Sequence, residues 1–248
     1  MPIYQIAIAI TAVSVISFIG VFTLALKHHY LRHLLLFLVS FSAGALLGDT
    51  FLHLLPELVE VSGLTLPLSL MILIGILTFF ILEKFLRWQH CHEIDCETHN
   101  TSLATMNLVG DGLHNFIDGM IIAGSFIASP ILGFATTLAV ALHEIPQEIG
   151  DFGVLLHAGL SRGQALAFNF ASALASFAGA FLMIIGATFI QDLAPYIIAL
   201  TAGGFLYIAS TDLIPELHKE TSIPASLGQL IGLVLGIGVM ASLLFLEG

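Results

Sequence analysis

The chain has 248 residues, of which 58% are hydrophobic and only 9% are charged. Soluble domains carry about 25% charged residues, so this composition excludes an ordinary soluble protein and predicts one embedded in a lipid bilayer. The formal net charge of −11, with six Lys and Arg residues, argues against nucleic acid as a partner. The two cysteines, Cys91 and Cys96, are too few for a disulfide-stapled domain.

Eight apolar runs are long enough to cross a bilayer as helices, since a span needs about 20 residues. The first run has no basic segment before it, so we expect a retained transmembrane helix rather than a cleaved signal peptide. The sequence therefore predicts an all-α, polytopic membrane protein that forms a single transmembrane domain over residues 1–248. The expected spans are 3–26, 33–57, 67–88, 103–127, 131–158, 164–190, 194–217 and 226–246.

The basic residues predict the orientation of these spans. All of them lie in or beside the odd-numbered connections, whereas the even-numbered connections and both termini have none. Cytoplasmic loops are enriched in Lys and Arg, so we expect the odd connections in the cytoplasm and both termini outside. The expected location is the cell (inner) membrane, as an integral, multi-pass protein. The basic residues are Lys27, Arg32, Lys84, Arg87, Arg162 and Lys219.

A short similarity between two of the runs indicates an internal repeat. LHLLPEL at 52–58 closes the second run, and TDLIPEL at 211–217 closes the seventh. These runs would cross the membrane in opposite directions. The similarity therefore favours inverted repeats of three helices on either side of the fourth and fifth, a 3+2+3 arrangement. Chance similarity between apolar segments is the alternative.

Polar side chains collect in the middle of the fourth and fifth runs. In the fourth run they are three, four and seven residues apart, which places them on one face of a helix. The fifth run carries polar residues at a matching depth, about ten residues from either membrane face. The two stripes are Asp111, His114, Asn115 and Asp118 in the fourth run, and His143, Glu144, Gln147, Glu148 and Asp151 in the fifth.

These stripes predict a binding site for a divalent cation. A single buried Asn or His is usually a helix–helix hydrogen bond, which is the structural alternative. Each ionisable residue costs about 2.5–3.5 kcal/mol in a membrane helix, however, and two facing stripes are too many for packing alone. Imidazole nitrogen together with carboxylate oxygen suits zinc, iron or manganese. Pro146 has no N–H to offer the carbonyl of Leu142, so it should bend the helix and free that oxygen beside the stripe.

Other polar residues fit either a path for the ion or a place at the membrane surface. The second and seventh runs carry His, Asp or Glu every four positions near one end, including Glu57. In the sixth run Asn169, with Ser172 one turn on, fits a helix–helix hydrogen bond equally well. The candidate path residues are Asp49, His53, Asp111, Glu148, Asp151, Asn169, Asp212 and Glu216.

The connection between the third and fourth runs reads HCHEIDCETH at 90–99. Its soft ligands predict a weak cytoplasmic metal trap, and a solvated flexible loop is the alternative. The spacing is not that of a CxxC knuckle, so we do not expect a structural zinc site. The candidate ligands are His90, Cys91, His92, Cys96 and His99.

Four segments resemble the signatures of the ZIP (Zrt-, Irt-like) family of divalent metal transporters. HNFIDG at 114–119 and HEIPQEIGDFGVLLHAG at 143–159 resemble its fourth and fifth helices, the latter in the subfamily that reads HExPHExGD. GDTFLHLLPE at 48–57 and DLIPE at 212–216 resemble its second and seventh helices. The resemblance covers all eight runs in order.

The resemblance implies a transporter that moves zinc, or iron, manganese or cadmium, toward the cytoplasm by alternating access. The metal would be the substrate rather than a cofactor. It also implies a homodimer in which helices one, four, five and six move against the others. One metal would bind His114, Asp118, His143 and Gln147, and a second would bind Asn115, Asp118, Glu144 and Gln147.

Gln147 departs from the family pattern, which has His or Glu at this position. Its neutral amide oxygen is a weaker ligand than imidazole for zinc. The two carboxylates of this ligand set, Asp118 and Glu144, balance the charge of one divalent ion. We therefore expect one metal to dominate at this centre.

An enzyme is the rival class of protein, and we expect no enzymatic activity. HEIPQ at 143–147 differs by one residue from HExxH, the helix signature of zinc proteases, and an intramembrane metalloprotease is the alternative. Gln147 replaces the second histidine of that signature, and Pro146 interrupts it. A metal-sensing receptor or a channel is a third class, which flux kinetics would distinguish.

Overall fold

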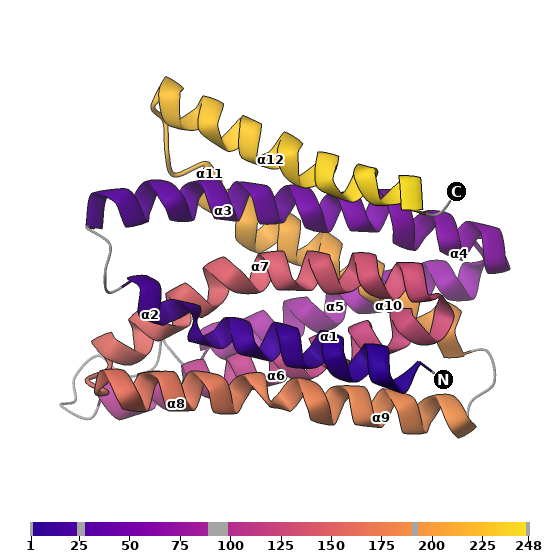
Figure 1. The fold of residues 1–248 in the computed structure, drawn as a ribbon, viewed down its shortest axis with the longest axis horizontal. Coiled ribbons are helices and arrows are strands. Elements are labelled where there is room, and N and C mark those ends of the chain that lie inside the picture. The colour runs from indigo at the N-terminus through magenta and orange to yellow at the C-terminus, as the bar shows by residue number, and fades with distance from the viewer. Residues whose placement is uncertain (1, 24–27, 89–98, 190–192, 247–248) are drawn as a thin grey trace.

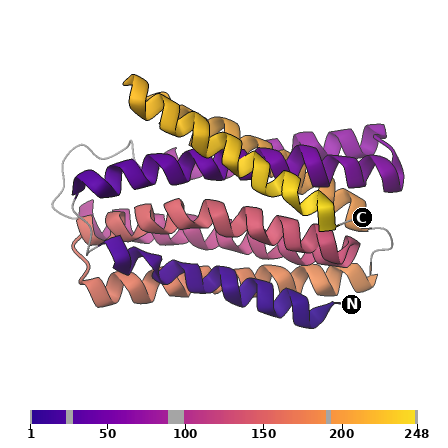
Figure 2. The same cartoon turned by 45° about the horizontal axis from the view of Figure 1, so that its top comes forward.

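The computed structural model describes residues 2–23, 28–88, 99–189 and 193–246, and over these residues the chain is helical without strands. The helices lie along one common direction, and both chain ends lie at the same end of the bundle (Figure 1; Figure 2). The helices are α1 (Ile3–Ile16), α2 (Gly20–Thr23), α3 (His28–Asp49), α4 (Leu55–Ser62), α5 (Leu66–Trp88), α6 (His99–Ala128), α7 (Pro130–His157), α8 (Arg162–Ala173), α9 (Ala175–Phe189), α10 (Leu193–Tyr207), α11 (Ile214–Leu217) and α12 (Ile223–Leu243).

Several helices have the length and apolar composition of membrane spans. In the described part of the chain, four stretches qualify: Leu34–Ser62, Arg162–Phe189, Leu193–Thr211 and Ile223–Leu243. Two shorter apolar helices cover Ile3–Ile19 and Leu66–Ile81. Helices α6 and α7 are 30 and 28 residues long, but they carry the acidic stripes in their middle. The chain is therefore an integral membrane protein.

The run expected as one helix over 164–190 is divided into α8 and α9 at Leu174. Serine hydroxyls satisfy the backbone carbonyl of Ala173 at this break. Ser176 donates to this oxygen at 2.6 Å, and Ser14 of α1 donates to it at 3.3 Å. The break is thus stabilised locally and by the neighbouring helix.

Two π-helical segments interrupt the long helices at related places. One spans Thr50–Leu54 between α3 and α4, and the other spans Ile208–Leu213 between α10 and α11. Each lies directly before a proline-containing turn, at Pro56 or Pro215. A proline has no N–H and its ring clashes with the carbonyl four residues earlier, and widening the preceding turn to a π-helix relieves this conflict. The two segments overlap the beginnings of the two similar sequences, 52–58 and 211–217.

Three helix pairs approach each other backbone to backbone through glycines. These pairs are α3 with α12, α5 with α10, and α6 with α9. A Cβ added at any of the glycines would lie between 1.8 and 2.2 Å from a carbonyl oxygen of the partner helix. Small residues at such contacts are typical of helix packing in membranes. The reciprocal glycines, defined here as the paired glycines, are Gly44 with Gly236, Gly75 with Gly203, and Gly119 with Gly179.

Candidate metal-binding site

The site forms where α6 and α7 lie side by side. Only Ser129 separates the two helices in the chain, so they must run antiparallel as neighbours. His114 and Asp118 are one turn apart on α6, and His143 and Glu144 are consecutive on α7. The short connection therefore brings the two polar stripes to the same depth.

Two imidazoles and two carboxylates converge here, and we call them the histidine centre: His114, Asp118, His143 and Glu144. The Nε2 atoms of the histidines are 3.2 Å apart. Oδ2 of Asp118 lies 3.7 Å from Nε2 of His114 and 3.4 Å from Nε2 of His143. Oε1 of Glu144 lies 3.4 and 3.5 Å from the same nitrogens.

These spacings fit the ligand shell of a tetrahedral zinc ion. With zinc–nitrogen and zinc–oxygen bonds of about 2.0–2.2 Å, the ligands of a regular tetrahedron lie about 3.3–3.6 Å apart. The five distances between these nitrogen and oxygen atoms range from 3.2 to 3.7 Å, around that value. The set of two nitrogens and two oxygens also suits zinc chemically.

The charged groups of the histidine centre are buried without ordinary hydrogen-bond donors. Asp118 is 0% exposed, and His143 and Glu144 are each 1% exposed. Both oxygens of Asp118 and Oε1 of Glu144 accept no hydrogen bond from the part of the chain that the structure describes. A buried carboxylate without donors is costly, and a bound cation removes that cost.

Neighbouring groups orient the histidines. Nδ1 of His143 lies 3.2 Å from the carbonyl oxygen of Ala139, so a proton on Nδ1 leaves the lone pair of Nε2 facing the centre. Phe79 of α5 packs edge-on against His114 with ring centroids 6.0 Å apart, and Phe205 of α10 does so against His143 at 6.2 Å. These apolar walls keep water away from the ligands.

A second group of carboxylates adjoins the histidine centre, and we call it the oxygen cluster: Asp111, Glu144 and Glu148. One carboxylate oxygen from each lies within 4.8 Å of the others. Oδ1 of Asp111 accepts from the amide of Asn115 at 2.8 Å, and Oδ2 accepts from the hydroxyl of Ser172. The amide of Asn169 donates to the carboxylate of Glu148. Three candidate path residues, Asp111, Glu148 and Asn169, therefore lie close together.

Further path candidates lie on either side. Asp151 of α7 lies next to Asn107 of α6, a residue that sequence reasoning missed. Asp49 is buried beside Thr136 of α7, and Nε2 of His53 lies 3.0 Å from the carbonyl oxygen of Met240. At the end of the bundle where the chain termini lie, a pocket of about 220 Å³ opens between α4 and the start of α7. Its polar lining consists of His53, Glu57, Glu60 and Ser129.

Several sequence-predicted residues lie outside the histidine centre. Asn115 is turned toward Asp111, as described above. Gln147 is half-buried one turn beyond His143 on α7. Asp212 lies in the second π-helical segment and Glu216 in α11. The predicted metal loop, with His90, Cys91, His92 and Cys96, lies outside the described residues, and His99 begins α6.

The carbonyl oxygen of Leu142 is occupied, contrary to the expectation that Pro146 leaves it free. Helix α7 continues through Pro146 and changes direction along its course (Figure 1). The hydroxyl of Ser42 on α3 donates to this oxygen. Sequence reasoning missed Ser42, because a serine in an apolar run gives no sign of its partner.

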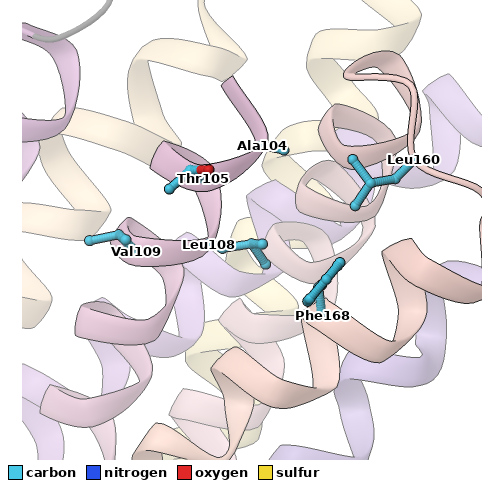
Figure 3. A pocket seen from close by; sticks show the side chains of 6 residues that line it. All are labelled: Ala104, Thr105, Leu108, Val109, Leu160 and Phe168. Carbon is cyan, nitrogen blue, oxygen red and sulfur yellow. The ribbon is translucent and has the colours of Figure 1, made fainter. Parts of the chain in front are cut away.

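A groove of about 370 Å³ between α6 and α8 has no part in metal binding. Figure 3 shows its side chains, which carry no ionisable group. An apolar lining of this kind suits a lipid tail better than a cation. The lining residues are Ala104, Thr105, Leu108, Val109, Leu160 and Phe168.

Apolar helices of membrane length around a buried cluster of imidazoles and carboxylates define a helical membrane protein with an internal metal-binding centre. The chain belongs to the ZIP zinc transporter family, whose family model matches residues 3–102 and 87–244.

Named relatives agree with this assignment. The chain is 37% identical over 219 residues to "Zinc transporter ZIP13" of Pongo abelii, covering 82% of this chain and 65% of that protein. It is 32% identical over 255 residues to "Zinc transporter ZIP13" of Homo sapiens, covering 82% of this chain and 69% of that protein. It is 42% identical over 151 residues to "Zinc transporter foi" of Drosophila melanogaster, covering 60% of this chain and only 21% of that protein.

Proposed function

We propose that the protein transports zinc across the membrane, with the histidine centre as the site where the ion is held midway. The observation that carries this proposal is the spacing of the four ligand atoms, which matches a tetrahedral zinc shell. The names of the relatives support zinc as the substrate. The ion is cargo, so no resident cofactor is needed.

The membrane arrangement we propose has eight spans in a 3+2+3 order, with both termini outside the inner membrane. The common position of the chain ends supports an even number of spans (Figure 1). The two π-helical segments occupy equivalent places in the second and seventh spans. The helix contacts follow the same symmetry between the repeats. The pair α3 and α12 corresponds to the pair α10 and α5. The pair α1 and α7 likewise corresponds to the pair α9 and α6.

The path we propose begins at the pocket lined by His53, Glu57 and Glu60 and passes Asp49 to the histidine centre. From there the ion moves along α7 past the oxygen cluster and Asp151 to the cytoplasm. Asn115, Gln147, Asn169, Asp212 and Glu216 remain proposed ligands or path residues. Alternating access would come from α1, α6, α7, α8 and α9 moving against the other helices in a homodimer.

Transport fits the site better than proteolysis. In a zinc protease of the HExxH type both histidines lie on one helix. Here the histidine beside His143 is His114 of the neighbouring helix. Gln147 occupies the position of the second histidine in the protease signature. Two acids from different helices complete the shell, which leaves no open position for a nucleophilic water. The family relatives are named transporters.

Zinc uptake into proteoliposomes that contain the purified protein tests the proposal. Saturable uptake without cleavage of added peptides is expected. His143→Ala and Asp118→Ala should abolish uptake, because each removes a metal ligand. The protein should still insert into the membrane, since each variant also removes a buried polar group that is costly to insert. His218→Ala, at an exposed position after α11, is the matched control and should transport normally. Unimpaired uptake by His143→Ala would remove the histidine centre from the transport path.

A further inference from the structure

We propose that the groove between α6 and α8 binds one anionic phospholipid, with an acyl chain along the groove and the phosphate group at the start of α8. Arg162 and Gln164 would bind the phosphate, and Leu108, Val109 and Phe168 would contact the chain. The site needs no metal and shares no residue with the histidine centre. Only the choice of the cytoplasmic leaflet rests on the orientation proposed above.

The groove has the size and the lining of a site for a hydrocarbon chain. Its volume of about 370 Å³ lies within the range of roughly 300–1,000 Å³ that small-molecule sites occupy. Leu108, Leu160 and Phe168 surround the same space (Figure 3). Leu108 and Leu160 also pack against a buried apolar cluster that includes Phe152 and Leu155. The fold therefore fixes the floor of the groove before any ligand enters.

The groove is open on the side that faces away from the bundle. Val109 on α6 and Phe168 on α8 are 50% and 46% exposed. Phe168 lies six residues after the start of α8, which is about 9 Å along the axis at a rise of about 1.5 Å per residue. An acyl chain in the groove would therefore lie directly below a headgroup at the start of α8.

A single positive charge stands at the start of α8. Arg162 is the first residue of this helix, it is exposed, and it forms no ion pair with a described residue. It is also the only Lys, Arg, Asp or Glu residue between Asp151 and Asp192. Arginine binds phosphate oxygens through paired N–H donors, and basic residues at a membrane surface attract anionic lipids. The charge at the groove thus complements a phospholipid phosphate.

Gln164 offers a second donor beside this charge. Its Oε1 accepts from the backbone N–H of Ser161 at 3.0 Å and from the hydroxyl of Ser161 at 2.8 Å. Both contacts use the oxygen of the amide, so the Nε2 group keeps its hydrogens for another acceptor. Gln164 lies one turn before Phe168 on the same face of α8. A phosphate at the end of the groove would therefore accept from a side chain that the capping box already orients.

A second copy of the chain fits the groove less well than a lipid does. The interface of a symmetric dimer places the same surface on both sides. An interface centred on the groove would therefore bring two Arg162 side chains together, and the neighbouring sequence supplies no acidic residue to pair with them. Like charges that lose their water repel each other. An anionic phospholipid supplies the opposite charge together with an apolar chain.

Photo-cross-linking to the purified full-length protein in nonionic detergent tests this site without any metal or transport measurement. The probe is phosphatidylglycerol with a diazirine in its acyl chain, and peptide mapping identifies the labelled residues. Labels are expected within 104–109 and 160–168. Unlabelled phosphatidylglycerol should compete about fivefold better than phosphatidylcholine, and inorganic phosphate should not compete. Arg162→Gln should remove this preference, and Val109→Trp should abolish labelling of the groove by filling it.

Two variants outside the groove are the matched controls. Lys84→Gln removes an exposed positive charge from α5, and Val234→Trp enlarges an exposed valine of α12. Both should keep the labelling and the preference of the wild type. Absence of labels in the groove would show that something else covers it and would overturn the proposal. Equal competition by the two lipids, or an equal effect of Lys84→Gln and Arg162→Gln, would also overturn it. Failure of zinc uptake would contradict only the proposed function.

Discussion

The hydroxyl of Ser42 on α3 donates a hydrogen bond to the carbonyl oxygen of Leu142 on α7 at 2.6 Å. Pro146 follows this carbonyl by one helical turn and cannot donate to it. A serine of a neighbouring helix thus supplies the donor that the proline lacks, directly before His143. The same hydroxyl lies 2.8 Å from the carbonyl oxygen of Leu38 in its own helix.

Replacing Ser42 with alanine should destabilise the protein by about 1–3 kcal/mol, because the buried carbonyl of Leu142 loses its donor. Thermal unfolding in detergent measures the effect. Ser69→Ala is the control, since the exposed hydroxyl of Ser69 bonds only to the carbonyl of Thr65 one turn earlier. Equal unfolding temperatures for the two variants would show that the bond between α3 and α7 contributes nothing.

Gly204→Ala should weaken zinc binding without touching a ligand. A Cβ at Gly204 would lie 2.5 Å from the ring of Phe79, so the ring must shift, and this ring packs against His114. We expect a several-fold loss of zinc affinity and a destabilisation of about 1–3 kcal/mol. Isothermal titration with zinc measures the affinity.

Gly238→Ala in α12 is the matched control for this variant, because a Cβ there would meet nothing within 4 Å. It should bind zinc normally. Normal zinc affinity in Gly204→Ala together with a lowered unfolding temperature would mean that Phe79 packs against His114 without positioning it.

Gln147→His should tighten the binding of zinc or cadmium. The position is one turn from His143 on the same face of α7, and imidazole nitrogen is a better zinc ligand than an amide oxygen. A tighter centre releases its ion more slowly, so maximal uptake should fall. Gln147→Asn keeps the neutral amide and serves as the control. Unchanged zinc affinity in Gln147→His would place this side chain outside the ligand shell.

Cys91 and Cys96 should react with an impermeant thiol reagent only from the cytoplasmic face, because Lys84 and Arg87 hold their connection inside. A cysteine introduced at the exposed Ser62, where α4 ends, should react only from outside. Labelling of both sites from the same face of intact cells would contradict the proposed orientation.

Where helices are regular, periodicity in the sequence predicted which side chains converge. His114 and Asp118 on α6 and His143 and Glu144 on α7 meet because a one-residue connection forces the two helices together. At Thr50–Leu54 the π-helical turn changes the residue spacing. Asp49 and His53 still lie close enough to interact. The contact of His53 with the carbonyl oxygen of Met240 on α12, however, is one that a four-residue repeat could not predict.

The partner of a polar group on another helix is also invisible to periodicity. Ser42 and Ser172 lie in apolar runs, and their hydroxyls serve Leu142 and Asp111 on neighbouring helices. These contacts depend on how the helices are rotated against each other. Packing of distant segments fixes that rotation, and a local pattern does not contain it.

The paired glycines have a mechanical consequence. In each pair, a carbonyl of either helix packs against the glycine of the other, so the two helices interlock. Sliding one helix along its axis would push a carbonyl against a side chain next to the glycine. Helices α3 and α12, α5 and α10, and α6 and α9 should each move as rigid pairs. No paired glycine joins α3 to α7 or α10 to α6 in the described part of the chain. Shear is expected at these two unlocked faces, which border the histidine centre on either side.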